Sequence, residues 1–154
     1  MMSDVPPVPD GYPTISPGLA IAGAADAVEF YKRVLGATER MRIPGPGDTV
    51  MHCELLIGNS VLMLGDPAPD MAFRDPHSIG GTPVNLYVYV PDMDAAHAAA
   101  LAAGATEISA PQTQFYGDRT GSFVDPWGHQ WTVATHVEDI EPEEMQRRMD
   151  QLGS

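Results

Sequence analysis

Gly36-Ala37-Thr38-Glu39 occurs again as Gly104-Ala105-Thr106-Glu107, at an offset of 68 residues, and Asp26-Ala27 recurs at the same offset as Asp94-Ala95. Each Asp-Ala pair opens a stretch with helical spacing, and each tetrapeptide closes one. Internal repetition of this kind indicates one supersecondary unit that is used twice. The sequence therefore predicts a domain of two modules with a cleft between them, and the cleft is where a functional site is expected.

Composition favours one folded domain. The chain has 154 residues, of which 44% are hydrophobic and 19% charged, as in proteins with a packed core. Its longest apolar run, near residues 98–103, is far shorter than the roughly 20 residues of a membrane span, and no secretory signal pattern is present. Cys53 is the single cysteine and cannot form an internal disulfide, which fits a cytoplasmic location.

The net charge of −13, with only 8 Lys and Arg, repels phosphate backbones. We therefore expect neither a nucleic-acid partner nor a membrane partner. The same field attracts cationic ligands weakly over long range, although acidity also serves solubility alone in many proteins.

Residues 1–13 are rich in proline and are expected to form an extended arm. Module one should occupy residues 14–66. Apolar residues at helical spacing, followed by Gly36, predict a helix over residues 24–35. The strands of this module are expected at residues 14–21, 39–43, 50–57 and 60–65.

Residues 67–82 contain many Pro and Gly and are expected to link the modules, with a loop over the cleft. Module two should occupy residues 83–136. Asp92 is the expected N-cap of a helix over residues 93–103. The strands of this module are expected at residues 84–90, 107–109, 121–124 and 129–135, with a turn at 125–128 between the last two.

The chain should end in a helix within residues 137–154, because Pro142 suits the first position of a helix. Met145, Met149 and Leu152 form one apolar stripe on that helix. Such a stripe docks on the parent domain or on a partner subunit.

Side chains along a strand alternate between the two faces of a sheet. In residues 51–57 the set expected to pack on the helices is Met51, Cys53, Leu55 and Ile57, which places His52, Glu54 and Leu56 opposite. In residues 84–90 the helix-packed set is Val84, Leu86, Val88 and Val90, which places Asn85, Tyr87 and Tyr89 opposite. A concave surface with aromatic and polar groups suits a small-molecule site; the alternative is a face open to solvent.

Three stretches, at residues 24–31, 51–55 and 114–129, carry a resemblance to a known family. The last runs from Gln-Phe-Tyr-Gly-Asp-Arg into Asp-Pro-Trp-Gly-His. With the βαβββ order used twice, the chain resembles the vicinal oxygen chelate superfamily (glyoxalase/bleomycin resistance/dioxygenase), and within it the PhnB-like branch. The resemblance implies an α+β fold in which two βαβββ modules form a curved mixed sheet around a cup, and it implies a homodimer.

Enzymes of this superfamily often hold a divalent metal through four side chains, one in the first and one in the last strand of each module. The resemblance places these positions at Ser16 or Pro17, at Leu62, Met63 or Leu64, at Asn85, and at Thr132. None is a good ligand for a divalent ion, and only Gln130, two residues away, would improve the set. We therefore predict no metal ligands and no cofactor; the alternative is a protein that binds a divalent metal. A non-standard metal site would join His52 and Glu54 to a third ligand, His129 or His136.

Other candidates follow from residue chemistry. His52 and Glu54 share a face and are candidate ligand-binding or catalytic groups; Glu54 would act as a base if an apolar cup raised its pKa. Arg119, close to Tyr116 and Asp118, either clamps an anion or fixes its loop. Cys53 is expected on the helix-packed face, where a thiol is inert.

The residues expected to bind the ligand are His52, Glu54, Asn85, Tyr87, Tyr89, Phe115, Tyr116, Arg119 and Trp131. Phe115 and Trp131, like Met63, would also suit the hydrophobic core.

The sequence thus predicts a protein that binds a small molecule or drug in an aromatic and polar cup, as the resemblance to bleomycin resistance proteins implies. Aromatic and acidic groups would hold a planar or cationic compound. The alternative is a lyase, isomerase or dioxygenase-type enzyme of the same superfamily, with or without a metal.

Overall fold

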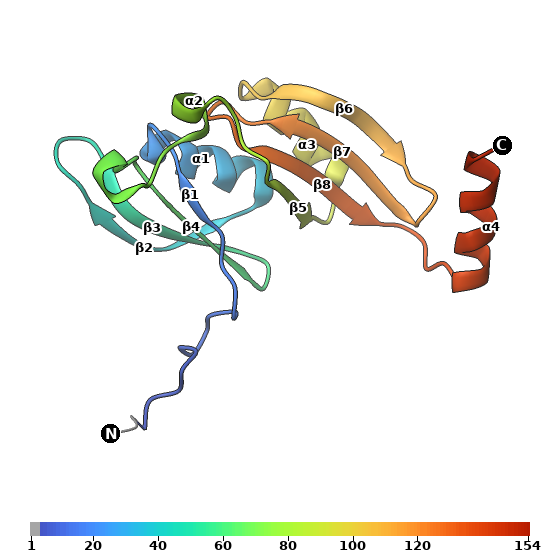
Figure 1. Ribbon diagram of the computed structural model, residues 1–154, viewed down its shortest axis with the longest axis horizontal. Helices are drawn as coiled ribbons and strands as arrows, with labels where there is room; N and C mark the ends of the chain where they lie inside the picture. Colours follow the sequence, from blue (N-terminus) through green and yellow to red (C-terminus); the bar gives the residue numbers. More distant parts are fainter. Residues whose placement is uncertain (1–3) are drawn as a thin grey trace. The chain divides into compact units, whose positions relative to one another are not determined.

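The computed structural model describes residues 4–154, which form two compact units, residues 4–80 and residues 81–154. Each unit is a βαβββ module with its own four-stranded mixed sheet (Figure 1). This confirms the predicted α+β class and the predicted use of one unit twice. The first three residues of the expected N-terminal arm lie outside the described residues.

The first unit contains β1 (Gly18–Ala20), α1 (Ala24–Leu35), β2 (Thr38–Pro44), β3 (Val50–Ile57) and β4 (Ser60–Gly65). Its sheet has the order β1-β4-β3-β2, in which β1 is parallel to β4 and the other neighbours are antiparallel. Two short helices, η1 (Pro69–Met71) and α2 (Pro76–Ile79), follow within the segment that was predicted to be an irregular linker.

The second unit contains β5 (Asn85–Tyr89), α3 (Met93–Ala102), β6 (Thr106–Thr113), β7 (Asp118–Val124), β8 (Gln130–His136) and α4 (Pro142–Leu152). The sheet order β5-β8-β7-β6 repeats the topology of the first unit, again with one parallel pair. The strands β6 and β7 are longer than predicted, so Asp118 and Arg119 lie in a strand and not in a turn-rich loop.

Local sequence explains both long helices. In α1 the apolar face is buried, with Tyr31 fully covered, and Gly36 ends the helix in the left-handed conformation at φ 67°, where its N–H donates to the carbonyl of Tyr31. In α3 the carboxylate of Asp92 accepts a hydrogen bond from the backbone N–H of Ala95 at 3.1 Å. The predicted N-cap is therefore confirmed.

The helix-packed face of β3 is formed by Cys53 and Leu55, both fully buried, as predicted. Met51 was predicted on this face but is 64% exposed. The reason is a β-bulge: Ile43 pairs with His52 and Pro44 pairs with Val50, so Met51 has no partner on β2 and the alternation of faces breaks there. Val84 is also exposed, contrary to prediction, because it precedes the first residue of β5.

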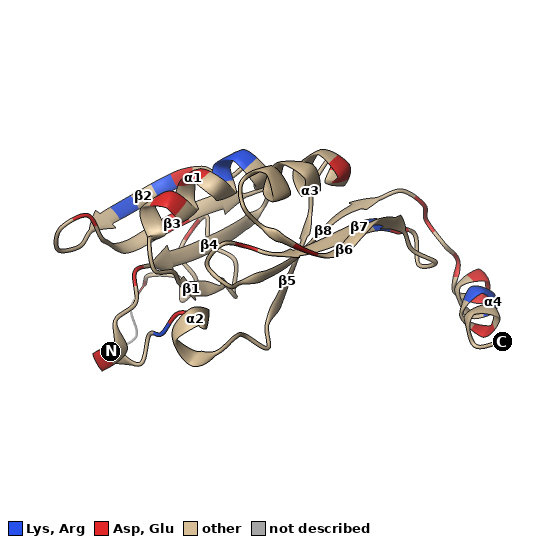
Figure 2. Ribbon diagram, turned by 90° about the horizontal axis from the view of Figure 1, so that it is seen from above, with Lys and Arg blue, Asp and Glu red and all other residues tan. Residues whose placement is uncertain are grey.

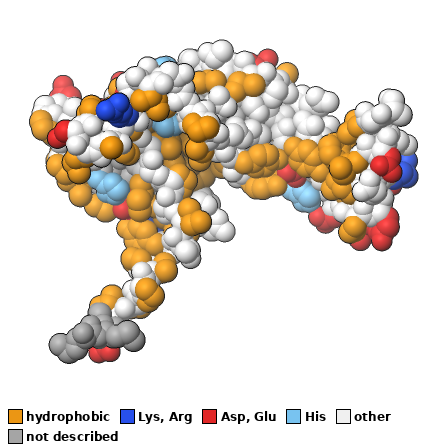
Figure 3. Space-filling view, viewed as in Figure 1, with side chains coloured by type: hydrophobic (Ala, Val, Ile, Leu, Met, Phe, Trp, Pro, Cys, Tyr) orange, Lys and Arg blue, Asp and Glu red, His pale blue; other side chains and the backbone are white. Residues whose placement is uncertain are grey.

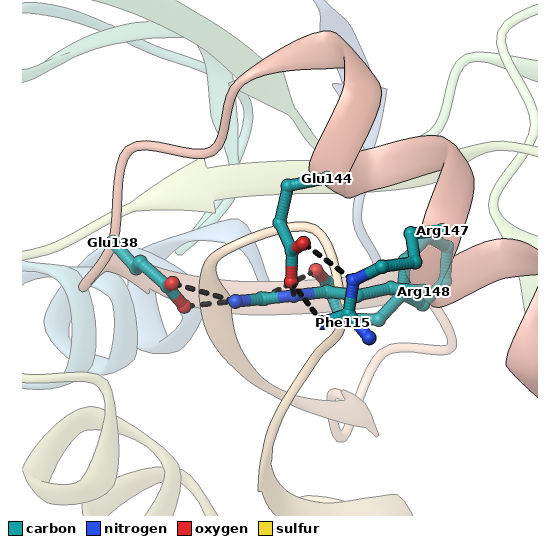
Figure 4. Close-up of polar contacts among 5 residues, drawn as sticks. All are labelled: Phe115, Glu138, Glu144, Arg147 and Arg148. Carbon is teal, nitrogen blue, oxygen red and sulfur yellow. Dashed lines mark hydrogen bonds and ion pairs between the residues drawn. The ribbon is translucent and has the colours of Figure 1, made fainter.

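The C-terminal helix α4 begins at Pro142, as predicted, and is tied to the second unit by Arg148 (Figure 4). The Arg148 guanidinium donates to Glu138 at 2.7 Å, to Glu144 at 2.9 Å and to the carbonyl oxygen of Phe115 at 3.0 Å. Met149 and Leu152 of the predicted stripe are exposed. Docking of this stripe, on the parent domain or on a partner subunit, stays a prediction.

Basic residues of the first unit lie on α1 and β2 next to acidic ones (Figure 2). Lys32 lies 3.3 Å from both Glu29 and Glu39, and Arg42 lies 2.7 Å from Glu39. These cations are therefore balanced locally. No helix within residues 4–154 is long and apolar enough to cross a membrane.

Candidate functional site

A groove of about 790 Å³ lies within the first unit, and we call it the first-unit groove. Its walls come from β3, β4 and the segment that follows β4. Three methionines, Met51, Met63 and Met71, line it together with Phe73 and His52. The groove is therefore largely apolar and sulfur-rich, with one imidazole in its wall.

Two features of the chain shape this groove. At Gly65 a Cβ atom would stand 2.5 Å from the backbone oxygen of Met51, so only glycine permits β4 to pass the start of β3 this closely. The next residue, Asp66, accepts hydrogen bonds from the backbone N–H groups of Val50 at 2.6 Å and Gly23 at 2.9 Å. This carboxylate fixes the start of β3 against the start of α1, and it lines the groove.

His52 links the groove to a buried acid. Its Nε2 lies 2.9 Å from Oε2 of Glu54, which is only 5% exposed. A carboxylate can only accept, so His52 Nε2 carries the proton and Nδ1 is the acceptor of the neutral ring. The other carboxylate oxygen of Glu54 accepts a hydrogen bond of 2.5 Å from the hydroxyl of Tyr12 in the N-terminal arm. Glu54 thus orients the imidazole at the edge of the groove.

The pKa of Glu54 is lowered, first by the hydrogen bond from Tyr12 and then by the hydrogen bond from His52, both of which outweigh burial. The raised pKa considered from the sequence is therefore wrong in direction. An ionised Glu54 is suited to orient His52 by accepting the hydrogen bond from its Nε2.

Arg40 holds the arm in this position. Its guanidinium carbon stands 4.4 Å from the centre of the Tyr12 ring, and its Nη2 donates to the carbonyl oxygen of Gly11 at 2.8 Å. The arm therefore contributes Tyr12 to the site of its own chain.

The second unit carries a separate polar cluster on the face of its sheet opposite α3. The hydroxyls of Tyr87 and Tyr89 both donate to Oδ2 of Asp118, at 2.7 and 2.8 Å. Asp118 is 4% exposed, and its Oδ1 accepts from Nδ1 of His136 at 2.8 Å. One buried carboxylate thus receives three hydrogen bonds from β5 and β8.

These hydrogen bonds determine which groups of the cluster are charged. Burial alone would raise the pKa of Asp118, but hydrogen bonds from His136, Tyr87 and Tyr89 lower it below its ordinary value. The pKa of Tyr87 is raised, first by burial and then by the bond to Asp118. Both tyrosines therefore stay protonated and act as donors.

His136 is bonded at both ring nitrogens, because its Nε2 lies 2.7 Å from Oδ1 of Asp139. Two carboxylate partners require two protons on the ring, and the pKa of His136 is raised by Asp118 first and by Asp139 second. A raised histidine pKa stabilises the fold below the unfolded value near 6.5, and this contribution is lost as pH rises through the folded pKa. The lowered pKa of Asp118 has the opposite pH dependence. It stabilises the fold at higher pH, and this contribution to stability is lost as pH falls below about 3.8.

We predict that NMR titration of the His136 ring will give a pKa above 6.5, and that Asp139→Asn will lower it while the pKa stays above that of an unfolded control peptide. Asp26→Asn, on the exposed face of α1 in the first unit, serves as the matched surface control and should leave the His136 titration unchanged. A His136 pKa at or below 6.5 in the wild-type protein would contradict this assignment.

Asn85 and Thr132, two of the positions at which the resemblance predicts metal ligands, bond to each other. Nδ2 of Asn85 donates to Oγ1 of Thr132 at 3.1 Å, and the hydroxyl of Ser122 lies 2.9 Å from the same oxygen. In the first unit, Met63 pairs with Gly18 across the parallel strands. Within each unit, as far as the described residues extend, no three His, Cys, Asp or Glu side chains gather closely enough to share an ion.

The remaining predicted residues take other places. Arg119 points to the α3 side, where it forms a bidentate pair with Asp94 at 2.8 and 2.9 Å. Trp131 is buried, and its Nε1 donates to Asp125 at 2.9 Å, as in a core side chain. Phe115 and Tyr116 stack edge to face in the turn before β7 with ring centres 5.2 Å apart.

Tyr12, Met51 and Met71 were not among the predicted site residues. Tyr12 lies 42 positions before Glu54, and a single aromatic residue in a proline-rich arm was the one available signal. Met51 was assigned to the opposite face because the bulge is not visible in the alternation pattern. Met71 lies in a segment without periodicity.

Comparison with known proteins agrees with this architecture. Residues 16–133 match the family model described as the Glyoxalase/Bleomycin resistance protein/Dioxygenase superfamily. An uncharacterized protein of Mycobacterium bovis is 39% identical over 144 residues, which cover 92% of this chain and 95% of that protein.

Among solved structures, TioX from Micromonospora sp. ML1 has a TM-score of 0.62 at 24% identity and covers 84% of this chain and 100% of its own. A PhnB protein from Bacillus cereus has a TM-score of 0.62 at 18% identity, with 80% of this chain and 99% of that chain covered. These two likenesses show the fold alone. Because the family model matches residues 16–133, which are most of the chain, the chain belongs to the glyoxalase/bleomycin resistance protein/dioxygenase superfamily.

Proposed function

We propose that this protein binds a small, largely apolar molecule with an aromatic part, a drug or a metabolite, in the first-unit groove. The observation that carries the proposal is the groove itself: about 790 Å³, within the range of about 300–1,000 Å³ of ligand sites, with apolar walls and one oriented imidazole. Thioether side chains adapt to ligands of different shape and make favourable contacts with aromatic rings. His52 would supply the polar contact that orients the ligand.

We also propose that binding does not require a divalent ion at the positions where family enzymes hold one. Support comes from the chemistry of those side chains: a thioether in β4, and an amide and a hydroxyl in the second unit that bond to each other. A place in the PhnB-like branch, a homodimer and a cytoplasmic location stay predictions from the sequence. Purified protein should stay free of stoichiometric zinc, nickel, iron or manganese in elemental analysis after exposure to these ions.

Filling the groove is the direct test of the proposal. Gly18 lines the groove, has no positive φ, and a Cβ there would meet no atom within 4 Å. A thermal-shift screen of aromatic drugs and metabolites should first yield a ligand, since a hundredfold excess over Kd stabilises a protein by about 2.7 kcal/mol. Gly18→Leu should weaken that ligand roughly tenfold or more in calorimetric titration, because the added side chain takes its space.

The matched control is Gly153→Leu, at the end of α4, where an added Cβ would approach only the backbone oxygen of Asp150, at 3.8 Å. This variant should bind as the wild type does. If the Gly18→Leu protein unfolds at the wild-type temperature and keeps full affinity for the ligand, the ligand does not bind in the groove.

The His52–Glu54 pair favours a second candidate, metal-independent proton transfer with His52 as general base. The carboxylate of Glu54 fixes the tautomer of His52 and leaves Nδ1 as the proton acceptor, and a general base of this kind contributes about 10²–10⁴-fold to rate. Each ligand from the screen would be incubated with the protein and followed by mass spectrometry. Product that disappears in His52→Gln, with ligand affinity retained, supports this candidate; ligands recovered unchanged in every case exclude it for the compounds tested.

A further inference from the structure

Tyr87 and Tyr89 form an aromatic pair on β5 that the proposed groove does not use. Their ring centres lie 5.4 Å apart with an angle of 58° between the rings. Tyr87 is 43% exposed and Tyr89 60% exposed. Figure 3 shows hydrophobic side chains gathered over β5 and β8, with a histidine and acidic side chains beside them. Two tilted, half-exposed rings thus offer their faces to a ligand.

The buried carboxylate of Asp118 holds both tyrosine rings in place. Both hydroxyls donate to the same oxygen of this carboxylate, and the other oxygen is taken by His136. The polar ends of the tyrosines are therefore directed inward, and a ligand on this face meets π surfaces instead of hydroxyl groups. A phenol that donates to a carboxylate gains electron density in its ring, and this strengthens the negative potential of the ring face.

The charges around the pair are also suited to a cation. His136 bonds to Asp118 on one side and to Asp139 on the other, so one imidazolium stands between two carboxylates. The cluster therefore has a net negative charge, within a chain whose formal charge is −13. The nearby cation Arg119 points to the opposite face of β7 and is paired with Asp94.

We propose that Tyr87 and Tyr89 form a second binding site, for an organic cation with diffuse charge such as a quaternary ammonium group. Aromatic faces attract such ions, which carry little hydration to lose. A primary ammonium is strongly hydrated and would need hydrogen-bond acceptors in exchange, whereas the carboxylate of Asp118 is only 4% exposed. This site is in the second unit and does not depend on the groove.

The test uses the full-length protein, choline as the cation, and 3,3-dimethyl-1-butanol as its neutral isostere at equal ionic strength. NMR of the tyrosine ring signals should show saturable shifts at Tyr87 and Tyr89, with choline bound about fivefold or more tightly than the isostere. Tyr89→Leu, at the more exposed ring, should weaken choline about fivefold, and Tyr89→Phe should weaken it less because the ring is retained.

Tyr12→Leu is the matched control, since Tyr12 also donates to a carboxylate but lies in the first unit. It should leave choline binding unchanged, as should Gly18→Leu, so that failure of this site and failure of the groove are distinguishable. Equal affinity for choline and the isostere, or no saturable shift at either ring in the wild-type protein, would overturn the proposal without reference to any variant.

Discussion

Replacing Asp118 with alanine is expected to lower the free energy of unfolding by about 3 kcal/mol, since hydrogen bonds to a buried charge are each worth about 1.5–3 kcal/mol and some of the lost bonds are regained with water. The carboxylate is 4% exposed and accepts from Tyr87, Tyr89 and His136. Its removal leaves three donors without their acceptor and opens a cavity beneath the two rings. Urea denaturation followed by circular dichroism, with unchanged m-values, would measure the loss.

Two comparisons make the Asp118 result specific. Asp118→Asn keeps the shape and one acceptor oxygen, so it should cost less than alanine. Asp139→Ala removes the other carboxylate partner of His136, but this side chain is 99% exposed and should change stability by less than about 0.5 kcal/mol. Equal effects of Asp118→Ala and Asp139→Ala would mean that the buried cluster does not stabilise the second unit.

Gly117→Ala should destabilise the protein by about 3 kcal/mol or more, through two separate costs. Gly117 has φ 97°, which disfavours any residue with a Cβ, and the added carbon would overlap the backbone oxygen of Glu138. Glu138 and Val137 both donate backbone hydrogen bonds to the carbonyl of Gly117, so the connection from β8 to α4 would have to move. Thermal and urea unfolding would both report the change.

Gly80→Ala separates the two costs. Gly80 has φ 90°, close to that of Gly117, but a Cβ there would meet nothing within 4 Å. It should therefore show only the conformational cost, about 1–2 kcal/mol. If Gly117→Ala were no worse than Gly80→Ala, the close approach of the two backbone segments would not be present in solution.

Elements governed by local chemistry could be predicted from the sequence. The helix α1 begins and ends at the predicted residues because its apolar spacing and Gly36 are both local signals. The strands β3 and β4 also have the predicted bounds, since the Gly58-Asn59 turn between them is encoded locally. The faces of β5 followed from alternation, which placed Tyr87 and Tyr89 opposite Leu86 and Val88.

Features that depend on pairing between distant segments could not be predicted. The bulge at Met51 arises from the register of β2 on β3, and it moves a predicted core residue into the wall of the groove. Glu54 meets Tyr12 across 42 positions, so the direction of its pKa shift could not follow from its neighbours in sequence. The strand β7 begins at Asp118, earlier than the turn-forming residues before it suggested. The side chain of Arg119 therefore lies on the face of the sheet that packs on α3.

The most direct test of the account is NMR of protein labelled with ¹³C at the methionine methyl groups, titrated with the compound that gives the largest thermal shift. The three groove methionines, Met51, Met63 and Met71, should shift together and saturate at one Kd, because they line one groove. The signals of Met93, the buried first residue of α3, and of Met149, exposed on α4, should keep their positions. Saturable shifts at Met149 or Met93, with the groove methionines unmoved, would contradict the claim that the first unit holds the ligand.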